Sequence, residues 1–541
     1  MEIKKIKIGE KSVFPFTIPS GIITTSASSI EVIANEIPEI GIITAKSTGI
    51  EPRQGYLEPI IHEYSRGCFI NAVGLANPGA DELAKELSEI NFPEDKFLLA
   101  SIFGKDAGEF VKVAKILEDF VDGFELNFSC PNVANYGSQI GENPLLVYEI
   151  TSLVCQNIEK PVFAKFGPNT NNLSEAAILA VKGGAYGISA INTAGPGEYL
   201  IDRNPVLSNK SGGLSGAGIL PIGLRCVSEI RKAVGEEPII IGIGGISCAR
   251  DVEQYYDSGA DIFGIGSALS GLDNSMLKKY FSELANDLRS GKNNASSLLI
   301  YPDTTYHKTR IEEELMHAPD FKTISTDLIL PDAGAGQFVF AWIPGIGEKP
   351  FSLVNNNPVT LGVLERGCFT KAFNSMKKGD SLYIRGPYGR KPEINYDCDI
   401  FLVGGGSGIA ALPMIAKYAG SVKHGRIAAM IGAKDSSHIP YIKELESMCE
   451  IFVSTEDGSM GEKGDVLRLF EKAKAGFGYY FNCGPREMIN SVLPIELGFS
   501  CPSLIYSSAD YLTKCGIGLC GSCADEKGRR SCTEGPFMHP E

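Results

Sequence analysis

Three features that define large classes of protein are missing from this 541-residue sequence. No apolar run approaches the roughly 18–20 residues that a membrane-spanning helix needs. Residues 1–14 include lysines but no apolar core and no small-residue cleavage site, so they are not typical of a secretory signal. The net charge of −15 argues against broad binding to nucleic acid or anionic lipid, both of which need basic surface. We therefore expect a cytoplasmic protein with neither nucleic acid nor membrane as a partner.

The residues that are present indicate a multidomain globular protein. The composition, with 43% apolar and 21% charged residues, is ordinary, and the length predicts two to four domains. Fourteen cysteines in a long cytoplasmic chain indicate metal binding, redox chemistry or buried thiols more than disulfides. Four of them lie together near the C-terminus, and this clustering is the informative feature.

Over residues 1–270, short β-branched segments alternate with amphipathic ones, which predicts a (β/α)8 barrel. Eight segments are predicted as its strands: Gly21–Thr25, Ile42–Lys46, Phe97–Phe103, Phe124–Phe128, Val162–Phe166, Gly187–Asn192, Ile239–Ile243 and Ile262–Gly266. Helices are predicted between them, for example over residues 81–90, 107–120 and 174–182.

The pattern changes after a helical segment that ends near Arg289. We place a first domain at residues 1–289 and a polar linker at 290–302. Short alternating segments with Gly and Pro predict a small antiparallel β-barrel at 303–395. Strand–helix alternation then predicts an α/β domain at 396–500, and residues 501–541 form a cysteine-rich, irregular domain.

Polar residues follow the predicted barrel strands, at the end where such barrels carry their active sites. Cys130 comes directly after the fourth strand, among Asn127, Ser129 and Asn132, whose side chains suit hydrogen bonding to a planar heterocycle. A buried thiol that only packs is the competing interpretation of a single cysteine.

Two lysines, Lys46 and Lys165, also lie in predicted strands. Burying a lysine is costly without an anionic partner, so together they indicate an anionic or electron-rich ligand; extension to solvent is the alternative. Glycine turns follow the seventh and eighth strands, at Gly244–Gly245 and Gly266–Ser267. Backbone N–H groups at these two places commonly bind phosphate in barrels.

Residues 1–270 resemble class 1 dihydroorotate dehydrogenases. The resemblance lies in KSTGIEPRQGY (46–56), NAVGLANPG (71–79), ELNFSCPNV (125–133), AKFGPN (164–169), INTAGPG (191–197), GGLSG (212–216), IGGI (243–246) and IGSAL (265–269). It implies oxidation of (S)-dihydroorotate to orotate, with Cys130 as the general base for the C5 proton while the C6 hydride passes to a flavin. A thiol with an ordinary pKa of about 8.5 can act near neutrality if its neighbours favour the thiolate.

The same resemblance implies the binding residues. FMN would contact Ser20, Lys46, Ser47, Asn127, Lys165, Ile191, Gly216, Gly244, Gly245, Gly266 and Ser267. Substrate would contact Lys46, Asn71, Ala72, Val73, Gly74, Leu75, Asn127, Asn192 and Thr193. Ser101 stands where the family more often has asparagine, so we expect a lost or rearranged flavin contact there without loss of activity.

The clustered cysteines have the spacing C-x4-C-x2-C, at Cys515, Cys520 and Cys523, with Cys532 nine positions further on. The first three match the plant-type [2Fe–2S] spacing. Zinc is the main rival, but zinc sites favour duplicated C-x2-C pairs, whereas this loop is glycine-rich. The sequence predicts a [2Fe–2S] cluster held by the four cysteines.

Residues 305–541 resemble the ferredoxin-reductase-like superfamily and, with these cysteines, the electron-transfer subunit of NAD-dependent (class 1B) dihydroorotate dehydrogenases. The matching segments are KPFSL (349–353), GCFT (367–370), GGGSGIAALP (404–413) and YFNCGPREM (480–488). FAD would contact Lys349, Pro350, Phe351, Ser352, Val363, Leu364, Glu365, Gly367 and Thr370. NAD+ would contact Gly404, Gly405, Gly406, Gly408, Cys483, Gly484 and Pro485.

Lys349 replaces the arginine usual in this family. It keeps a positive charge for the FAD diphosphate but loses the bidentate guanidinium, so we expect looser FAD binding. Fusion of the two halves implies a relay from FMN to [2Fe–2S] to FAD to NAD+. The family resemblance further implies a role in pyrimidine (UMP) biosynthesis and a homodimer formed through the barrel.

Three other functions remain open. They are a dihydropyrimidine-type dehydrogenase acting on uracil or thymine, an FMN-dependent tRNA dihydrouridine synthase, and a general NADH reductase in the C-terminal half that serves a separate partner. The segments NFSCPNV and NAVGLANPG favour dihydroorotate, and the acidic charge opposes an RNA substrate.

Overall fold

The computed structural model describes residues 3–129, 138–422 and 425–540. The chain divides into two compact units. Unit 1 comprises Met1–Pro302 with Ile517–Arg530, and unit 2 comprises Asp303–Gly516 with Ser531–Glu541. No helix among the described residues combines the length and apolar character that crossing a membrane requires.

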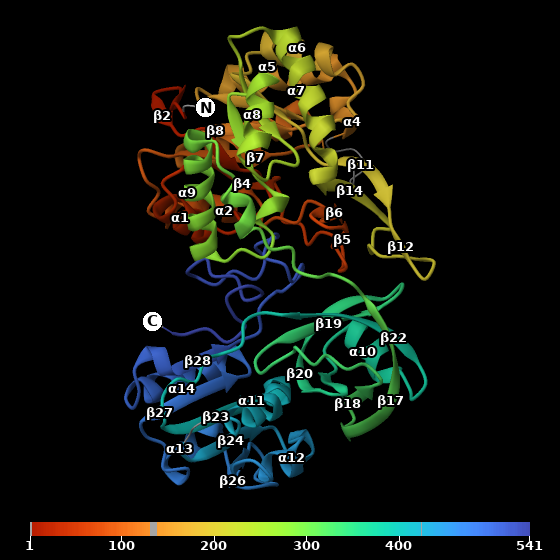
Figure 1. Ribbon diagram of the computed structural model, residues 1–541, viewed down its shortest axis with the longest axis vertical. Helices are drawn as coiled ribbons and strands as arrows, with labels where there is room; N and C mark the ends of the chain where they lie inside the picture. The colour runs from red at the N-terminus through yellow and green to blue at the C-terminus, as the bar shows by residue number, and fades with distance from the viewer. Residues whose placement is uncertain (1–2, 130–137, 423–424, 541) are drawn as a thin grey trace. The chain divides into compact units, whose positions relative to one another are not determined.

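Unit 1 is built on a closed barrel of parallel strands in the order β10-β15-β16-β3-β4-β7-β8-β9 (Figure 1). The strands are β3 (Phe16–Ile18), β4 (Ile40–Thr48), β7 (Phe97–Ile102), β8 (Gly123–Asn127), β9 (Val162–Phe166), β10 (Gly187–Ala190), β15 (Ile239–Ile243) and β16 (Ile262–Gly264). The helices that follow them are α1 (Ala27–Glu36), α2 (Ala80–Ser88), α3 (Ala107–Leu117), α5 (Pro144–Asn157), α6 (Leu173–Lys182), α7 (Leu220–Val234), α8 (Ala249–Asp257) and α9 (Asn274–Ser290). The predicted (β/α)8 barrel is confirmed.

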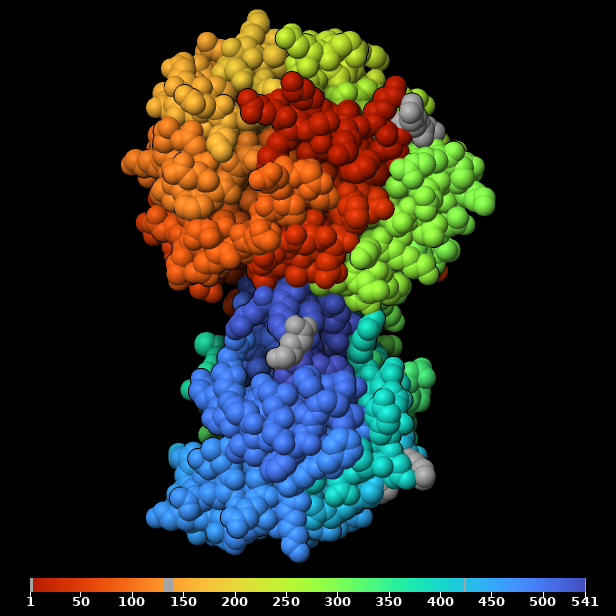
Figure 2. Space-filling model, turned by 90° about the vertical axis from the view of Figure 1, so that its left-hand side faces the viewer, coloured from red at the N-terminus to blue at the C-terminus, as the bar shows by residue number. Residues whose placement is uncertain are grey.

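The last barrel strand in the sequence, β16, pairs with the first, β3, and this pairing closes the barrel. Figure 2 accordingly shows the N-terminal residues in red beside the green residues of α9 on one face of the unit. Asp273 caps the N-terminus of helix α9, where its carboxylate accepts a 2.8 Å hydrogen bond from the backbone N–H of Met276. Gly291 caps its C-terminus in the left-handed conformation (φ +70°), which glycine adopts without penalty.

The first barrel strand lies earlier than we predicted. Residues 21–25 form consecutive tight turns, and the strand is β3, between Pro15 and Pro19. Ile23 has a φ of +64° and is fully buried, and the hydroxyl of Thr24 donates to the carbonyl of Thr44 at 2.6 Å. The β-branched residues of this segment therefore pack a turn against the barrel instead of extending a strand.

A four-stranded antiparallel sheet lies outside the barrel, in the order β11-β14-β6-β5. Its strands are β5 (Ile61–Ser65), β6 (Cys68–Asn71), β11 (Ala194–Glu198) and β14 (Ser211–Gly216). Two hairpins, β1–β2 (Ile6–Ile8, Lys11–Val13) and β12–β13 (Leu200–Ile201, Asn204–Pro205), complete the strands of unit 1. This sheet carries the segment predicted to contact substrate, so its position matters for the site.

Unit 2 begins with a second closed barrel, antiparallel, in the order β17-β18-β21-β20-β19-β22. Its strands are β17 (His307–Ala318), β18 (Phe321–Thr326), β19 (Phe338–Ile343), β20 (Gly347–Asn356), β21 (Val359–Leu364) and β22 (Ser381–Tyr388), with helix α10 (Cys368–Ser375) between the last two. The small β-barrel expected in this region is confirmed.

The rest of unit 2 is an α/β sheet in the order β26-β25-β24-β23-β27-β28, with parallel pairings throughout. Its strands are β23 (Asp399–Gly405), β24 (Ile427–Ala433), β25 (Glu450–Thr455), β26 (Glu462–Lys463), β27 (Gly478–Cys483) and β28 (Ile505–Ser508). Its helices are α11 (Leu412–Ala419), α12 (Ile442–Glu446), α13 (Leu469–Lys472) and α14 (Arg486–Leu497). Along β23, Ile400 and Leu402 pack into one apolar cluster and Phe401 and Val403 into another, as expected of a strand buried on both faces.

Candidate functional sites

Serine and asparagine side chains form a hydrogen-bonded chain across the carboxyl ends of the first strands of the large barrel. Ser47, in β4, contacts the hydroxyl of Ser20 at 3.1 Å and that of Ser101, in β7, at 2.8 Å. The amide of Asn127, at the end of β8, donates to the Ser47 hydroxyl at 3.1 Å. Ser101, the departure noted in the sequence, is fully buried and serves as a partner of Ser47.

The chain of hydrogen bonds continues through Ser129. Its hydroxyl donates to the Oδ1 atom of Asn127 at 3.0 Å and accepts a 2.8 Å bond from the amide of Asn192, after β10. The backbone N–H of Thr193 donates to Asn192 Oδ1 at 2.8 Å. Residues predicted from four separate strand ends, those of β3, β4, β8 and β10, are thus brought together. Cys130, predicted as the base, lies outside the described residues.

Lys165 forms a buried ion pair that the sequence did not reveal. Its amine lies 3.1 Å from Oε1 of Glu125 in the adjacent strand β8, and the two side chains are 5% and 2% exposed. Because the barrel itself supplies this anion, the charge of Lys165 does not require an anionic ligand. Lys46 lies against the turn at Gly21, because a Cβ added to Gly21 would be only 2.9 Å from the lysine amine. Lys46 is therefore close to Ser20, the residue before Gly21.

The substrate-binding segment that we predicted borders the same strand ends. Asn71, the last residue of β6, pairs with Gly213 of β14, whose carbonyl accepts a 3.4 Å bond from the Asn71 amide. A Cβ added to Gly213 would lie 2.0 Å from the hydroxyl oxygen of Thr193. The outer sheet therefore places Asn71 near Thr193, although the two residues are far apart in the sequence.

Three of the glycines predicted to contact FMN form close-packed turns. Gly216, Gly244 and Gly245 have φ values of +96°, +126° and +79°. A Cβ at Gly245 would lie 2.9 Å from the carbonyl oxygen of Gly216, and Tyr255 donates to the carbonyl of Gly244 at 2.8 Å. Such turns fit the phosphate of a flavin mononucleotide, because they allow the backbone to approach a ligand closely.

The segment Ile517–Arg530, which contains two of the clustered cysteines, packs within unit 1. The backbone N–H groups of Ile23 and Gly271 donate to the carbonyls of Leu519 and Ile517 at 2.7 and 2.9 Å. A Cβ at Gly521 would lie 2.1 Å from the Thr25 hydroxyl oxygen. The segment therefore contacts the loops that follow β3 and β16, the loops that also carry Ser20 and Ser267.

Buried Arg530 ties this segment to the barrel: its guanidinium donates to the carbonyls of Gly518 and Leu272 at 2.7 and 2.8 Å. The other two cysteines belong to unit 2, where Arg385 donates to the carbonyl of Cys515 at 3.0 Å.

All four clustered cysteines are wholly or partly buried. Cys515, Cys523 and Cys532 are buried and Cys520 is half-buried. Within the described ranges, no group of three or more His, Cys, Asp or Glu side chains is arranged to hold a metal ion. Four thiols in a glycine-rich loop nonetheless match the donor chemistry of a [2Fe–2S] cluster.

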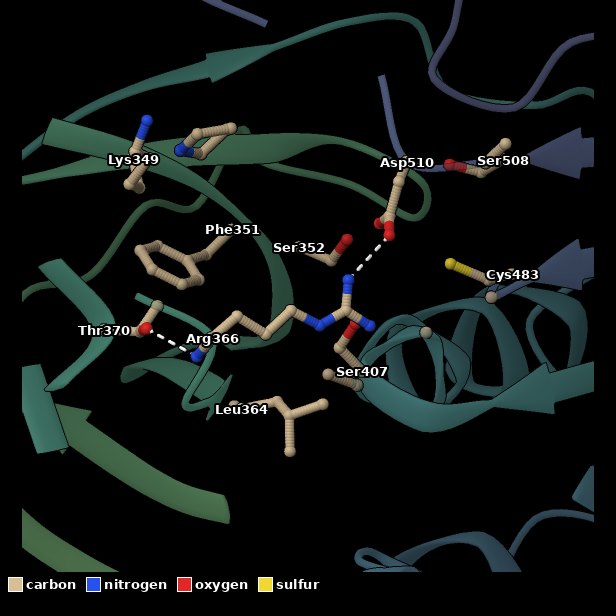
Figure 3. Close-up of a pocket in the computed structure, with 16 residues that line it drawn as sticks. Lys349, Phe351, Ser352, Leu364, Arg366, Thr370, Ser407, Cys483, Ser508 and Asp510 are labelled. Atoms are coloured by element: carbon tan, nitrogen blue, oxygen red, sulfur yellow. Dashed lines mark hydrogen bonds and ion pairs between the residues drawn. The ribbon is translucent and has the colours of Figure 1, made fainter. Parts of the chain in front are cut away.

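Unit 2 contains a cavity of about 340 Å³ between its β-barrel and its α/β sheet (Figure 3). Nine residues predicted to contact FAD or NAD+ line it: Lys349, Pro350, Phe351, Ser352, Leu364, Thr370, Gly408, Cys483 and Gly484. Arg366, Ser407, Ser508 and Asp510 line it as well, and the sequence did not single them out. Burial raises the pKa of the Cys483 thiol to about 12, so this thiol is neutral near pH 7.

A second cavity of about 470 Å³ lies at the carboxyl ends of the sheet strands and is lined by Gly405, Gly406 and Pro485, all predicted to contact NAD+. Val363, Glu365, Gly367 and Gly404 line neither cavity. Val363 instead packs in the core of the small barrel. Its strand neighbours Gly362 and Leu364 line the first cavity, as the alternation of side chains along a strand requires.

Comparison with known proteins covers the first half of the chain. Residues 5–288 match the dihydroorotate dehydrogenase family model. The "dihydroorotate dehydrogenase B (NAD(+)), catalytic subunit" of Pyrococcus horikoshii is 40% identical over 279 residues, which is 51% of this chain and 87% of that protein. The protein of the same name from Thermoplasma volcanium is 40% identical over 272 residues, which is 50% of this chain and 87% of that protein. The one from Methanocaldococcus jannaschii is 37% identical over 279 residues, which is 51% of this chain and 90% of that protein. This chain belongs to the dihydroorotate dehydrogenase family.

Proposed function

We propose that the large barrel oxidises (S)-dihydroorotate to orotate and that the electrons leave through the C-terminal half to NAD+. One observation carries the proposal. The segment with Cys520 and Cys523 contacts the loops after β3 and β16, which also hold predicted FMN contacts. A cluster on this segment would therefore lie beside the flavin site of its own chain, and no separate electron-transfer subunit would be needed. Two chains would pair through their barrels.

In the barrel, the side chains have distinct roles. Cys130 would act as the general base that removes the proton from C5 of the substrate. Hydrogen bonds from Ser129 to Asn127 Oδ1, and from Asn127 to Ser47, fix this amide before substrate arrives, and Ser129 orients Asn192 in the same way. FMN held by the residues at these strand ends would supply the acceptor for the C6 hydride, and a [2Fe–2S] cluster and FAD would supply the route from that flavin to NAD+.

In unit 2, FAD would occupy the cavity lined by Lys349–Ser352 and Thr370, and NAD+ the neighbouring cavity at Gly405, Gly406 and Pro485. Leu364 lines both cavities, so the two ligands would lie next to one another. This arrangement suits hydride exchange between a flavin and a nicotinamide, which requires the two rings to be in contact.

The cofactor content tests this proposal. Purified under anaerobic conditions, the chain should contain FMN and FAD in equal amounts, with iron and acid-labile sulfide at two each per chain. Flavins would be identified by chromatography after denaturation, and metals by elemental analysis. Zinc in place of iron would refute the cluster, and FMN without FAD would refute the relay.

A further inference from the structure

Three charged side chains line the cavity shown in Figure 3, and two of them are cationic. Lys349 lies on β20, and Arg366 lies in the loop between β21 and α10. The third is Asp510, two residues after β28, and its Oδ2 atom is 2.7 Å from Nη1 of Arg366. In Figure 3 the guanidinium of Arg366 extends across the cavity to reach Asp510, whereas the amine of Lys349 points away from Asp510.

The base of the Arg366 side chain is held in place by its own loop. The backbone N–H groups of Arg366 and Gly367 donate to the hydroxyl of Thr370 at 2.8 and 3.0 Å. The far end is held much less firmly, because the side chains of Arg366 and Asp510 are 51% and 67% exposed. An ion pair so exposed to water contributes little to stability, so the guanidinium can change partner at small cost.

We propose that Arg366 binds the diphosphate of FAD and releases Asp510 when it does so. This inference rests on the proposed FAD site. Lys349 supplies only a point charge, whereas a guanidinium can donate two parallel hydrogen bonds to a phosphate. Arg366 thus provides the bidentate hydrogen bonding that Lys349 cannot. When Arg366 releases Asp510, the two cations of the cavity, Lys349 and Arg366, match the two negative charges of a diphosphate.

Two other roles lead to different results. If the Arg366–Asp510 ion pair only stabilises the shape of the cavity, removing either partner should change the affinity for FAD by the same amount. If Arg366 binds the diphosphate of NAD+ instead, its removal should weaken binding of the nicotinamide dinucleotide and leave FAD affinity unchanged.

The test compares the affinity for FAD among variants of the full-length chain. FAD is first removed at high salt, and its rebinding is then measured by the quenching of FAD fluorescence. Arg366→Ala should weaken FAD binding about 10- to 100-fold, the usual range for a charge-assisted hydrogen bond. Arg366→Lys should fall between Ala and wild type. Asp510→Asn should bind FAD more tightly than wild type, because the competing carboxylate is gone. Lys349→Arg should restore affinity to the Arg366→Ala variant.

A second measurement separates the two dinucleotides. The affinity of each FAD-saturated variant for NADH, from steady-state titration, should stay at the wild-type value. Equal weakening by Arg366→Ala and Asp510→Asn, or unchanged FAD affinity in Arg366→Ala, would overturn the role of Arg366. A wild-type chain that binds no FAD would instead overturn the proposed function on which it rests.

Discussion

Replacing Cys130 by alanine is expected to slow the reduction of FMN by dihydroorotate about 10²- to 10⁴-fold, the usual contribution of a positioned general base. The residue directly follows Ser129, which is hydrogen-bonded to both Asn127 and Asn192. The thiol thus lies in sequence next to the polar groups that would hold the substrate ring. Stopped-flow recording of flavin absorbance after anaerobic mixing measures this rate directly.

Two controls distinguish a base from a structural thiol. Serine at position 130 should retain part of the activity, since a hydroxyl is a poorer base than a thiol at neutral pH. Oxidation of NADH by an artificial dye should keep its wild-type rate in both variants, because that reaction belongs to unit 2. If the two activities fell together, Cys130 would have a structural role.

Replacing Cys520 or Cys523 by serine is expected to abolish NAD+ reduction by dihydroorotate. Each half of the chain should still carry out its own flavin reaction. Loss of a thiolate ligand should remove the cluster or lower its occupancy. Dihydroorotate should still bleach the FMN in a single turnover, and NADH should still reduce the FAD. Steady-state formation of NADH from dihydroorotate should fail, because the electrons then have no path between the two flavins.

Cys501 supplies a matched control for these variants. It is an exposed free thiol in the same C-terminal region but outside the spaced quartet. Cys501→Ser should keep its iron and its coupled rate. An iron-free Cys520→Ser protein that coupled the two substrates at the wild-type rate would show that electrons bypass the cluster, and the C-terminal half would then need another partner.

The barrel could be predicted because its signals are local. Alternation of β-branched and amphipathic segments marks strands and helices, and the polar residues after each strand lie together once the barrel closes. The position predicted for the first strand was wrong because the prediction used local signals alone. Ile22 to Thr25 have the composition of a strand, but Ile23 sits in a left-handed turn whose backbone bonds to Leu519, almost five hundred residues later. No local pattern carries that contact.

The charged contacts of the sites could not be predicted because they depend on the pairing of distant segments. Glu125 and Lys165 meet only through the register of β8 against β9. Arg366 and Asp510 are 144 positions apart and meet only because β21 and β28 border one cavity. In both cases the sequence shows the charge but not its partner.

Anaerobic mixing of the full-length chain with dihydroorotate, followed by addition of NAD+, tests the central claim most directly. We expect dihydroorotate to bleach both flavins, with orotate formed in proportion, and NAD+ then to restore the flavin absorbance as NADH appears. Bleaching by dihydrouracil but not by dihydroorotate would contradict the proposed substrate. Bleaching of FMN alone, with no NADH formed after NAD+ is added, would contradict the proposed route of the electrons.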